Sequence, residues 1–74
     1  MPQRKLIPRV KSLGELARLG LDDDRYTKLA IAAAQNLGGT ADTLTGAMQW
    51  LRLNAQETDE DGVVQEVNAC RDLI

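Results

Sequence analysis

The stretch between the aspartates at 22–24 and the glycines at 38–39 limits the possible folds more than any other part of the chain. Its apolar residues recur at the spacing of a helix with one buried face, and they are Tyr26, Leu29, Ala30, Ala33 and Leu37. The aspartates offer cap oxygens and negative charge to a helix start, and paired glycines commonly end a helix. The stretch therefore predicts a helix, and its alanines allow a neighbouring helix to pack closely.

A shorter helix is expected before it. Ser12 and Glu15 have the spacing of a capping box, in which the serine hydroxyl accepts from the Glu15 amide. Gly20 is suited to ending this helix in a left-handed conformation. We then expect Leu21 to fold back onto Leu16 and to join the core.

Two more helices are expected on either side of an acidic stretch. The third is expected to begin at a Thr40 cap and to run to about Gln56, with an apolar arc covering more than half its circumference. The fourth is expected after a Thr58 or Asp59 cap. The sequence thus predicts an all-α fold, a small three- to four-helix bundle whose second and third helices form an antiparallel hairpin. The expected core comprises Leu16, Leu21, Tyr26, Leu29, Ala33, Leu37, Leu44, Met48, Leu51, Val63, Val67 and Cys70.

Residues 1–11 are interpreted as an extended basic arm in front of a single helical domain at 12–74. Pro2 and Pro8 each push the preceding residue toward extended geometry. Such an arm can lie on the domain, bind a partner or stay loose. Its basic side chains are Arg4, Lys5, Arg9 and Lys11.

The net charge of −2 is unevenly distributed along the chain. The first 20 residues carry five basic residues against one acidic residue, and the rest carries four against ten. Such asymmetry bears on partners rather than on fold. The chain start lacks the apolar stretch of a signal peptide, and the longest apolar run, at 29–34, is far shorter than the roughly 18 residues of a membrane span. We expect a soluble, cytoplasmic protein with no membrane partner.

The side chains that usually carry catalysis are scarce. There is no histidine, Ser12 is the only serine, and Cys70 is the only cysteine. The serine is explained as a helix cap, and the cysteine falls on an apolar face. The acidic stretch before Gly62 has some of the spacing of a calcium loop, but Asn68 stands where the bidentate glutamate belongs. We expect no enzyme activity, no cofactor and no metal.

Trp50 and Leu53 lie outside the main apolar stripe of the third helix, with Arg52 beside them. Trp50 is either a wedge in the core or an anchor for a partner, because tryptophan is enriched in binding hot spots. The sequence predicts a non-enzymatic protein-binding module, acting as an adaptor, an inhibitor or a regulatory subunit of a larger complex. Its small size and acidity also suit a phage- or plasmid-encoded inhibitor whose acidic surface occupies a basic groove. The predicted contact residues are Trp50, Leu53, Arg52, Glu57, Asp59, Glu60 and Asp61.

A nucleic-acid-binding regulator is the alternative function. The basic arm can neutralise phosphates, and flexible basic arms do enter minor grooves. The acidic body and a third helix with Arg52 as its one basic residue oppose this interpretation. A homodimer formed through the third helix is compatible with either function.

Overall fold

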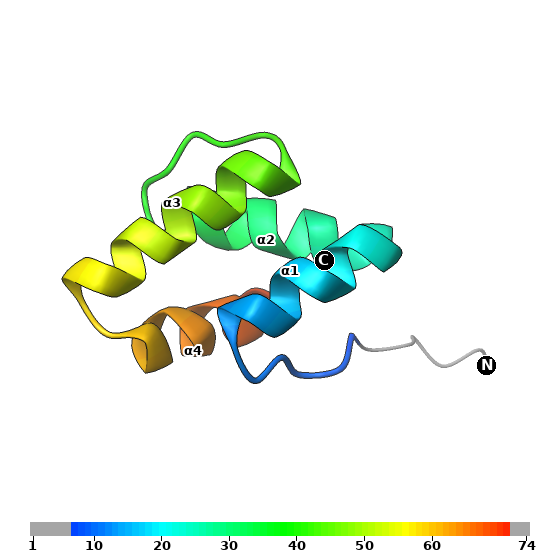
Figure 1. Cartoon of the computed structure of the whole chain (residues 1–74), viewed down its shortest axis with the longest axis horizontal. Coiled ribbons are helices and arrows are strands. Elements are labelled where there is room, and N and C mark those ends of the chain that lie inside the picture. Colours follow the sequence, from blue (N-terminus) through cyan, green and yellow to red (C-terminus); the bar gives the residue numbers. More distant parts are fainter. Residues whose placement is uncertain (1–6, 72–74) are drawn as a thin grey trace.

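The computed structural model describes residues 7–71, which form four helices (Figure 1). These are α1 (Leu13–Asp22), α2 (Asp24–Asn36), α3 (Leu44–Glu57) and α4 (Glu60–Cys70). No strand lies within the described range, so the predicted all-α fold is confirmed. None of these four helices is long and apolar enough to cross a membrane.

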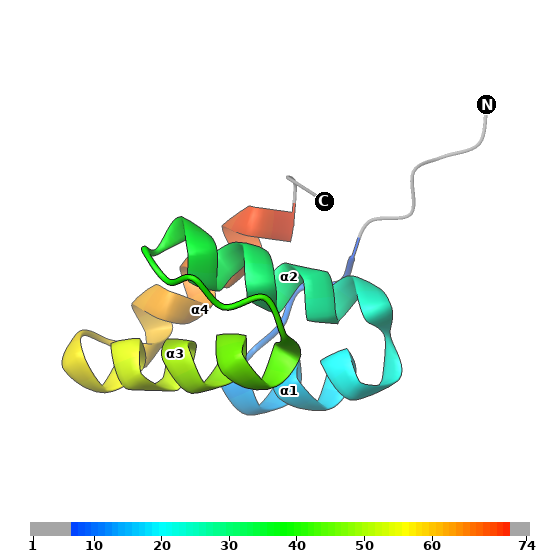
Figure 2. The same ribbon diagram turned by 90° about the horizontal axis from the view of Figure 1, so that it is seen from above.

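Helices α2 and α3 are the central elements, since each of them contacts all three other helices. Helix α1 also packs against α3, and α3 packs against α4. Figure 2 shows α1 and α3 side by side, running in opposite directions. The predicted bundle is confirmed.

The relative direction of α2 and α3 differs from the prediction of an antiparallel hairpin. The connecting residues 37–43 turn back along α2, so both helices run the same way (Figures 1 and 2). Gly39 accordingly lies beside the middle of α3, where an added Cβ would be 3.0 Å from Trp50 Cδ2. Leu44, at the start of α3, lies against Gly20, which is near the end of α1 and therefore close to the start of α2. A connection of seven residues is long enough for the chain to run back along α2. The two glycines alone did not indicate this.

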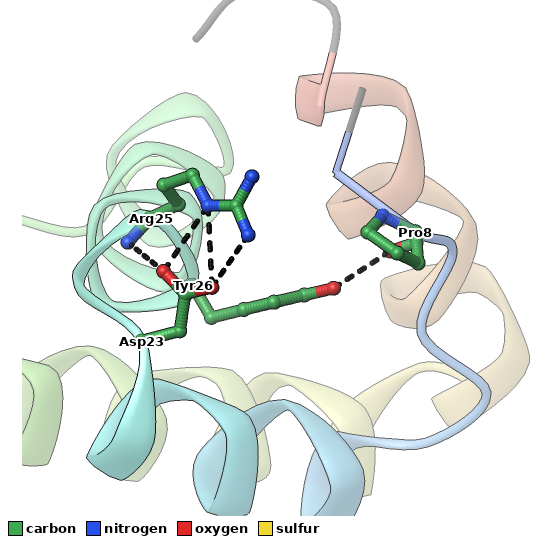
Figure 3. A network of polar contacts seen from close by, with 4 residues as sticks. All are labelled: Pro8, Asp23, Arg25 and Tyr26. Atoms are coloured by element: carbon green, nitrogen blue, oxygen red, sulfur yellow. Dashed lines mark hydrogen bonds and ion pairs between the residues drawn. The ribbon is translucent and has the colours of Figure 1, made fainter. Parts of the chain in front are cut away.

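The start and end of α2 use the residues that the sequence indicated. Asp23 is the N-cap, and its Oδ1 accepts a hydrogen bond from the Arg25 amide at 2.9 Å (Figure 3). The Arg25 guanidinium donates to the same carboxylate, and this hydrogen bond together with the Asp23 charge raises the pKa of Arg25. At the other end Gly38 has a φ of 109°, and the Gly39 amide donates to the Ala34 carbonyl at 2.8 Å.

Helix α1 begins as predicted but ends later. The Ser12 hydroxyl accepts from the Glu15 amide at 3.1 Å. The helix then continues through Gly20, where an added Cβ would lie 2.9 Å from Leu44 Cδ1, so this glycine permits close approach of α3 rather than ending the helix. Leu21 is consequently 80% exposed, and its predicted place in the core is wrong.

Helix α3 begins later than predicted, with Thr43 rather than Thr40 as its N-cap. The Thr43 hydroxyl accepts from the Gly46 amide at 3.1 Å. The residues before it are held near the end of α2, because the Gln35 side-chain amide donates to the Ala41 carbonyl at 3.0 Å. The return of the chain therefore uses several residues that the sequence had assigned to the helix.

The core contains most of the predicted residues. Leu37 and Leu44 are only partly buried and pack against its edge. Ile7 and Val10, from the segment interpreted as an arm, are buried in it. The predicted residues found buried are Leu16, Tyr26, Leu29, Ala33, Met48, Leu51, Val63, Val67 and Cys70.

The segment before α1 is fixed to α4 by a buried asparagine. The Val10 amide donates to Asn68 Oδ1 at 2.8 Å, and Asn68 Nδ2 donates to the Val10 carbonyl at 2.9 Å. This pair satisfies both backbone groups of a residue that is only 1% exposed. The Arg71 guanidinium further donates to the Ile7 carbonyl at 3.0 Å. From Ile7 onward the chain is therefore part of the packed domain.

The same segment also touches α2. The Tyr26 hydroxyl lies 3.4 Å from the Pro8 carbonyl, to which it donates (Figure 3). In residues 7–11, the described part of the arm, the basic side chains are Arg9 and Lys11, and both are exposed. Arg4 and Lys5 lie outside the described residues.

Candidate protein-binding surfaces

One face of α3 presents an apolar and acidic surface. Trp50, Leu53, Asn54 and Glu57 line a hollow of about 230 Å³, and we call this surface the Trp50 edge. Leu53 is 54% exposed. Trp50 is partly buried and packs against the core, with its indole ring against Gly39. Trp50 therefore combines the two expected roles. It packs against the core and Gly39, and it also lines the surface hollow.

Arg52 lies on the other side of α3. Arg52 is two positions after Trp50, which corresponds to about 200° around a helix, so the two side chains point in nearly opposite directions. Arg52 instead lines two hollows between α3 and α1. The structure therefore does not bring Arg52 into the Trp50 edge with which it was grouped.

The two hollows that share Arg52 form what we call the α1–α3 groove. The smaller one, of about 190 Å³, lies toward the end of α1 and is mainly apolar; it is lined by Ala17, Leu21, Leu44, Thr45, Met48 and Arg52. The larger one, of about 330 Å³, lies toward the start of α1 and is lined by Leu13, Gly14, Arg52, Ala55, Gln56 and Glu60. The groove therefore follows both helices for most of the length of α1.

The predicted acidic residues surround the turn between α3 and α4 but face different surfaces. Glu57 belongs to the Trp50 edge, Glu60 to the α1–α3 groove, and Asp61 to a hollow beside the N-terminal segment. Asp59 is the N-cap of α4, without a side-chain capping hydrogen bond. All four are exposed, and none forms an ion pair within residues 7–71. In that range no group of three acidic or cysteine side chains is placed to hold a metal ion.

The basic side chains Arg9 and Lys11 share a hollow of about 390 Å³ with Asp61. A carboxylate in the same hollow reduces the positive potential that a phosphate group would meet. The described part of the arm is therefore a surface of mixed charge, packed along α4.

Ser12 and Cys70, the side chains that could act as nucleophiles, both have structural roles. Ser12 caps α1. Cys70 is 1% exposed, and its burial, followed by the nearby Glu66 carboxylate, raises the pKa of its thiol. A thiol in this setting stays protonated at neutral pH and behaves as a small apolar side chain.

Reasoning from the sequence missed the α1–α3 groove. Once α1 continues past Gly20, the residues Gly14, Ala17 and Leu21 are spaced i, i+3 and i+7 on one face. This spacing is visible in the sequence, but the expected helix end at Gly20 assigned Leu21 to the core. The error in the helix boundary therefore hid the surface.

Comparisons of the chain with protein-family models, with curated proteins and with solved structures find no match. No family and no relative thus indicates a partner or an activity. The function is inferred from the surfaces of the chain alone.

Proposed function

We propose that the chain is a non-enzymatic protein-binding module that holds a basic surface of a larger protein against the Trp50 edge. The observation that carries this proposal is the position of Leu53, which is 54% exposed beside a partly buried tryptophan and the Glu57 carboxylate, which has no ion-pair partner among residues 7–71. In this role it acts as an adaptor, an inhibitor or a regulatory subunit. An inhibitor encoded by a phage or plasmid is one form of such a module, and a cytoplasmic location suits its single thiol.

The apolar part of the Trp50 edge supplies affinity. An exposed leucine by itself is common on protein surfaces. Here it lies next to a tryptophan that already packs against the core and Gly39, so less side-chain entropy is lost when a partner covers the ring. Rigid aromatic groups beside small apolar contacts are typical of binding hot spots.

The acidic part supplies the preference for a basic partner. Glu57 lies in the hollow itself, and Asp59 follows it at the turn. Neither has an ion-pair partner within residues 7–71, so their charge is available for an incoming lysine or arginine. Complementary charge of this kind speeds association and excludes acidic partners more than it adds affinity.

The test uses a variant of the Trp50 edge with Leu53→Ser, Glu57→Gln and Asp59→Asn. Glu57→Gln and Asp59→Asn keep the size of the side chains at the two helix ends, and asparagine remains a good N-cap. The matched control carries Asp22→Asn and Asp42→Asn, which also remove two exposed carboxylates, and it keeps Leu21 because this residue lines the α1–α3 groove. Helical circular dichroism and thermal unfolding verify that both variants fold.

The wild-type chain and both variants are immobilised and incubated with lysate of the cells in which the chain occurs. Support requires a protein that the wild type and the control retain, that the Trp50-edge variant loses, and that binds less as salt rises. Equal retention by all three chains, or no retained protein, would contradict the proposal. Micromolar binding of a non-specific DNA duplex that falls steeply with salt would instead favour the nucleic-acid regulator.

A further inference from the structure

The α1–α3 groove has two hollows; the one at Leu21 is mainly apolar, and the one at Gly14 is lined by both apolar and polar residues. On α1, Gly14 lies at one hollow and Leu21 at the other, seven residues apart. Seven residues of a helix span about 10.5 Å along its axis. Gly14 leaves open space at its end, because only the Ser12 hydroxyl, at 3.9 Å, lies within 4 Å of an added Cβ.

This spacing selects a helical occupant over an extended one. On a helix, side chains at i and i+7 share one face and lie about 10.5 Å apart along the axis, which equals the distance along α1 between Gly14 and Leu21, one at each hollow. On a strand, about 10 Å corresponds to three residues, and side chains three apart point to opposite faces. A helix laid along the groove therefore fills both hollows, and an extended peptide does not.

One arginine lines both hollows, and a second is exposed on α1 between Gly14 and Leu21 in the sequence. Arg52 lines both of them. Arg18 is exposed on α1, four residues after Gly14 and three before Leu21, so helical geometry places it within about 60° of both. Neither arginine forms an ion pair in the described part of the chain, and Glu60 lines only the hollow near the start of α1. The middle of the groove is thus positively charged.

We propose that the α1–α3 groove is a second docking site, which binds an amphipathic helix of a partner protein with apolar side chains at i and i+7 and a carboxylate at i+3 or i+4. The carboxylate faces Arg18 and Arg52, and the apolar side chains enter the two hollows. Helices commonly dock in grooves through residues with this spacing. The site is independent of the Trp50 edge and prefers the opposite charge.

A second copy of this chain does not supply such a helix. Within residues 7–71 the large apolar side chains that are exposed are Leu21 and Leu53, which belong to different helices. No helix of the described part therefore presents an exposed pair at i and i+7. A two-fold pairing of grooves would also bring the arginines of both copies together, which like-charge repulsion opposes.

The experiment uses two synthetic peptides of 18 residues, measured by fluorescence anisotropy against the full chain. Both have leucines at i and i+7 in an alanine-rich helix; one carries glutamates at i+3 and i+4, and the other carries lysines. We expect the glutamate peptide to bind several-fold more tightly at low salt, since the two arginines attract its glutamates and repel the lysines of the other peptide. The preference should shrink as salt rises.

Variants of the chain then locate the site. Arg18→Glu with Arg52→Glu should reverse the preference between the peptides, and Arg18→Gln with Arg52→Gln should abolish it. Leu21→Ser should weaken the glutamate peptide several-fold. The Trp50-edge variant should bind it as the wild type does, which separates this site from the proposed function.

Three results would overturn the inference. One is the absence of any preference for the glutamate peptide, and another is an unchanged preference in both double-arginine variants. The third is concentration-dependent self-association of the chain that Leu21→Ser removes, because this would assign the groove to a second copy. Sedimentation at two concentrations measures it.

Discussion

Replacing Asn68 with alanine should lower the free energy of unfolding far more than replacing an exposed asparagine does. Asn68 is 5% exposed and exchanges two hydrogen bonds with the backbone of Val10, which lies 58 residues away along the chain. Alanine can make neither bond. The Val10 amide and carbonyl would then be buried without partners, or the N-terminal segment would leave its place.

The size of the effect follows from these two alternatives. Leaving a buried polar backbone group without a partner costs about 1–3 kcal/mol, so two groups cost about 2–6 kcal/mol. Detaching the segment avoids that penalty but exposes Ile7 and Val10, each worth about 1.5–3 kcal/mol when fully buried. Both routes lower the free energy of unfolding by about 2–6 kcal/mol. That is a large share of the roughly 4–11 kcal/mol typical for a chain of this length.

Urea unfolding followed by circular dichroism measures the loss, and limited trypsin digestion reports on the segment. We expect Asn68→Ala to be cleaved faster after Arg9 and Lys11 than the wild type. Asn36→Ala is the matched control, because its exposed side chain bonds only to Glu66, and it should cost less than about 0.5 kcal/mol. A loss below about 1 kcal/mol in Asn68→Ala, with unchanged cleavage, would refute the reasoning.

Four further predictions concern the connection after α2, the start of α4 and, in two cases, the thiol. Gly39→Ala should cost about 1–3 kcal/mol in urea unfolding, because its Cβ would lie 3.0 Å from both the Ala34 carbonyl and Trp50 Cδ2; a neutral result would contradict the packing of the indole. Gly62→Ala, with nothing within 4 Å of its Cβ, should instead stabilise by up to about 1 kcal/mol, and destabilisation would argue against the open space there. Cys70 should react slowly with a disulfide reagent in the folded chain at pH 8 and rapidly in urea, and equal rates would contradict its burial. Because the thiol pKa is raised in the folded state, the unfolded chain loses this proton first, so the free energy of unfolding should fall as pH rises past about 8.5; the Cys70→Ala variant should lack this contribution.

Local features of the fold were predictable because they depend on near neighbours in the sequence. The Ser12 cap needs only the Glu15 amide three residues later, and Asp23 needs only Arg25. The buried stripe of α2 is fixed by helical spacing. These elements require no knowledge of how the chain returns on itself.

The features that escaped prediction depend on contacts between distant residues. Residues 37–43 make α2 and α3 run in the same direction, which no local pattern indicates. The place of Val10 in the core depends on Asn68. From the sequence, Asn68 was considered only as a residue that does not fit the last ligand position of a calcium loop. Gly20 was interpreted as a helix end, although its function is to let Leu44 approach.

The candidate site was predictable only in part for the same reason. Trp50, Leu53 and Glu57 share a face of α3 at helical spacing, and the structure brings them together. Arg52 is adjacent in sequence but points away, toward α1. The acidic residues follow one another along the chain, yet the turn before α4 directs them to three surfaces. Adjacency in sequence was therefore a poorer guide than position around the helix.

Photo-crosslinking at Leu53 tests most directly whether the chain acts by holding another protein at the Trp50 edge. A benzoyl-phenylalanine at this position is irradiated in the cells where the chain occurs, and the same group at Lys28, exposed on α2, serves as the control. Covalent attachment to a single protein from position 53 and not from position 28 is the predicted result. No adduct at position 53, or the same adducts from both positions, would contradict the account.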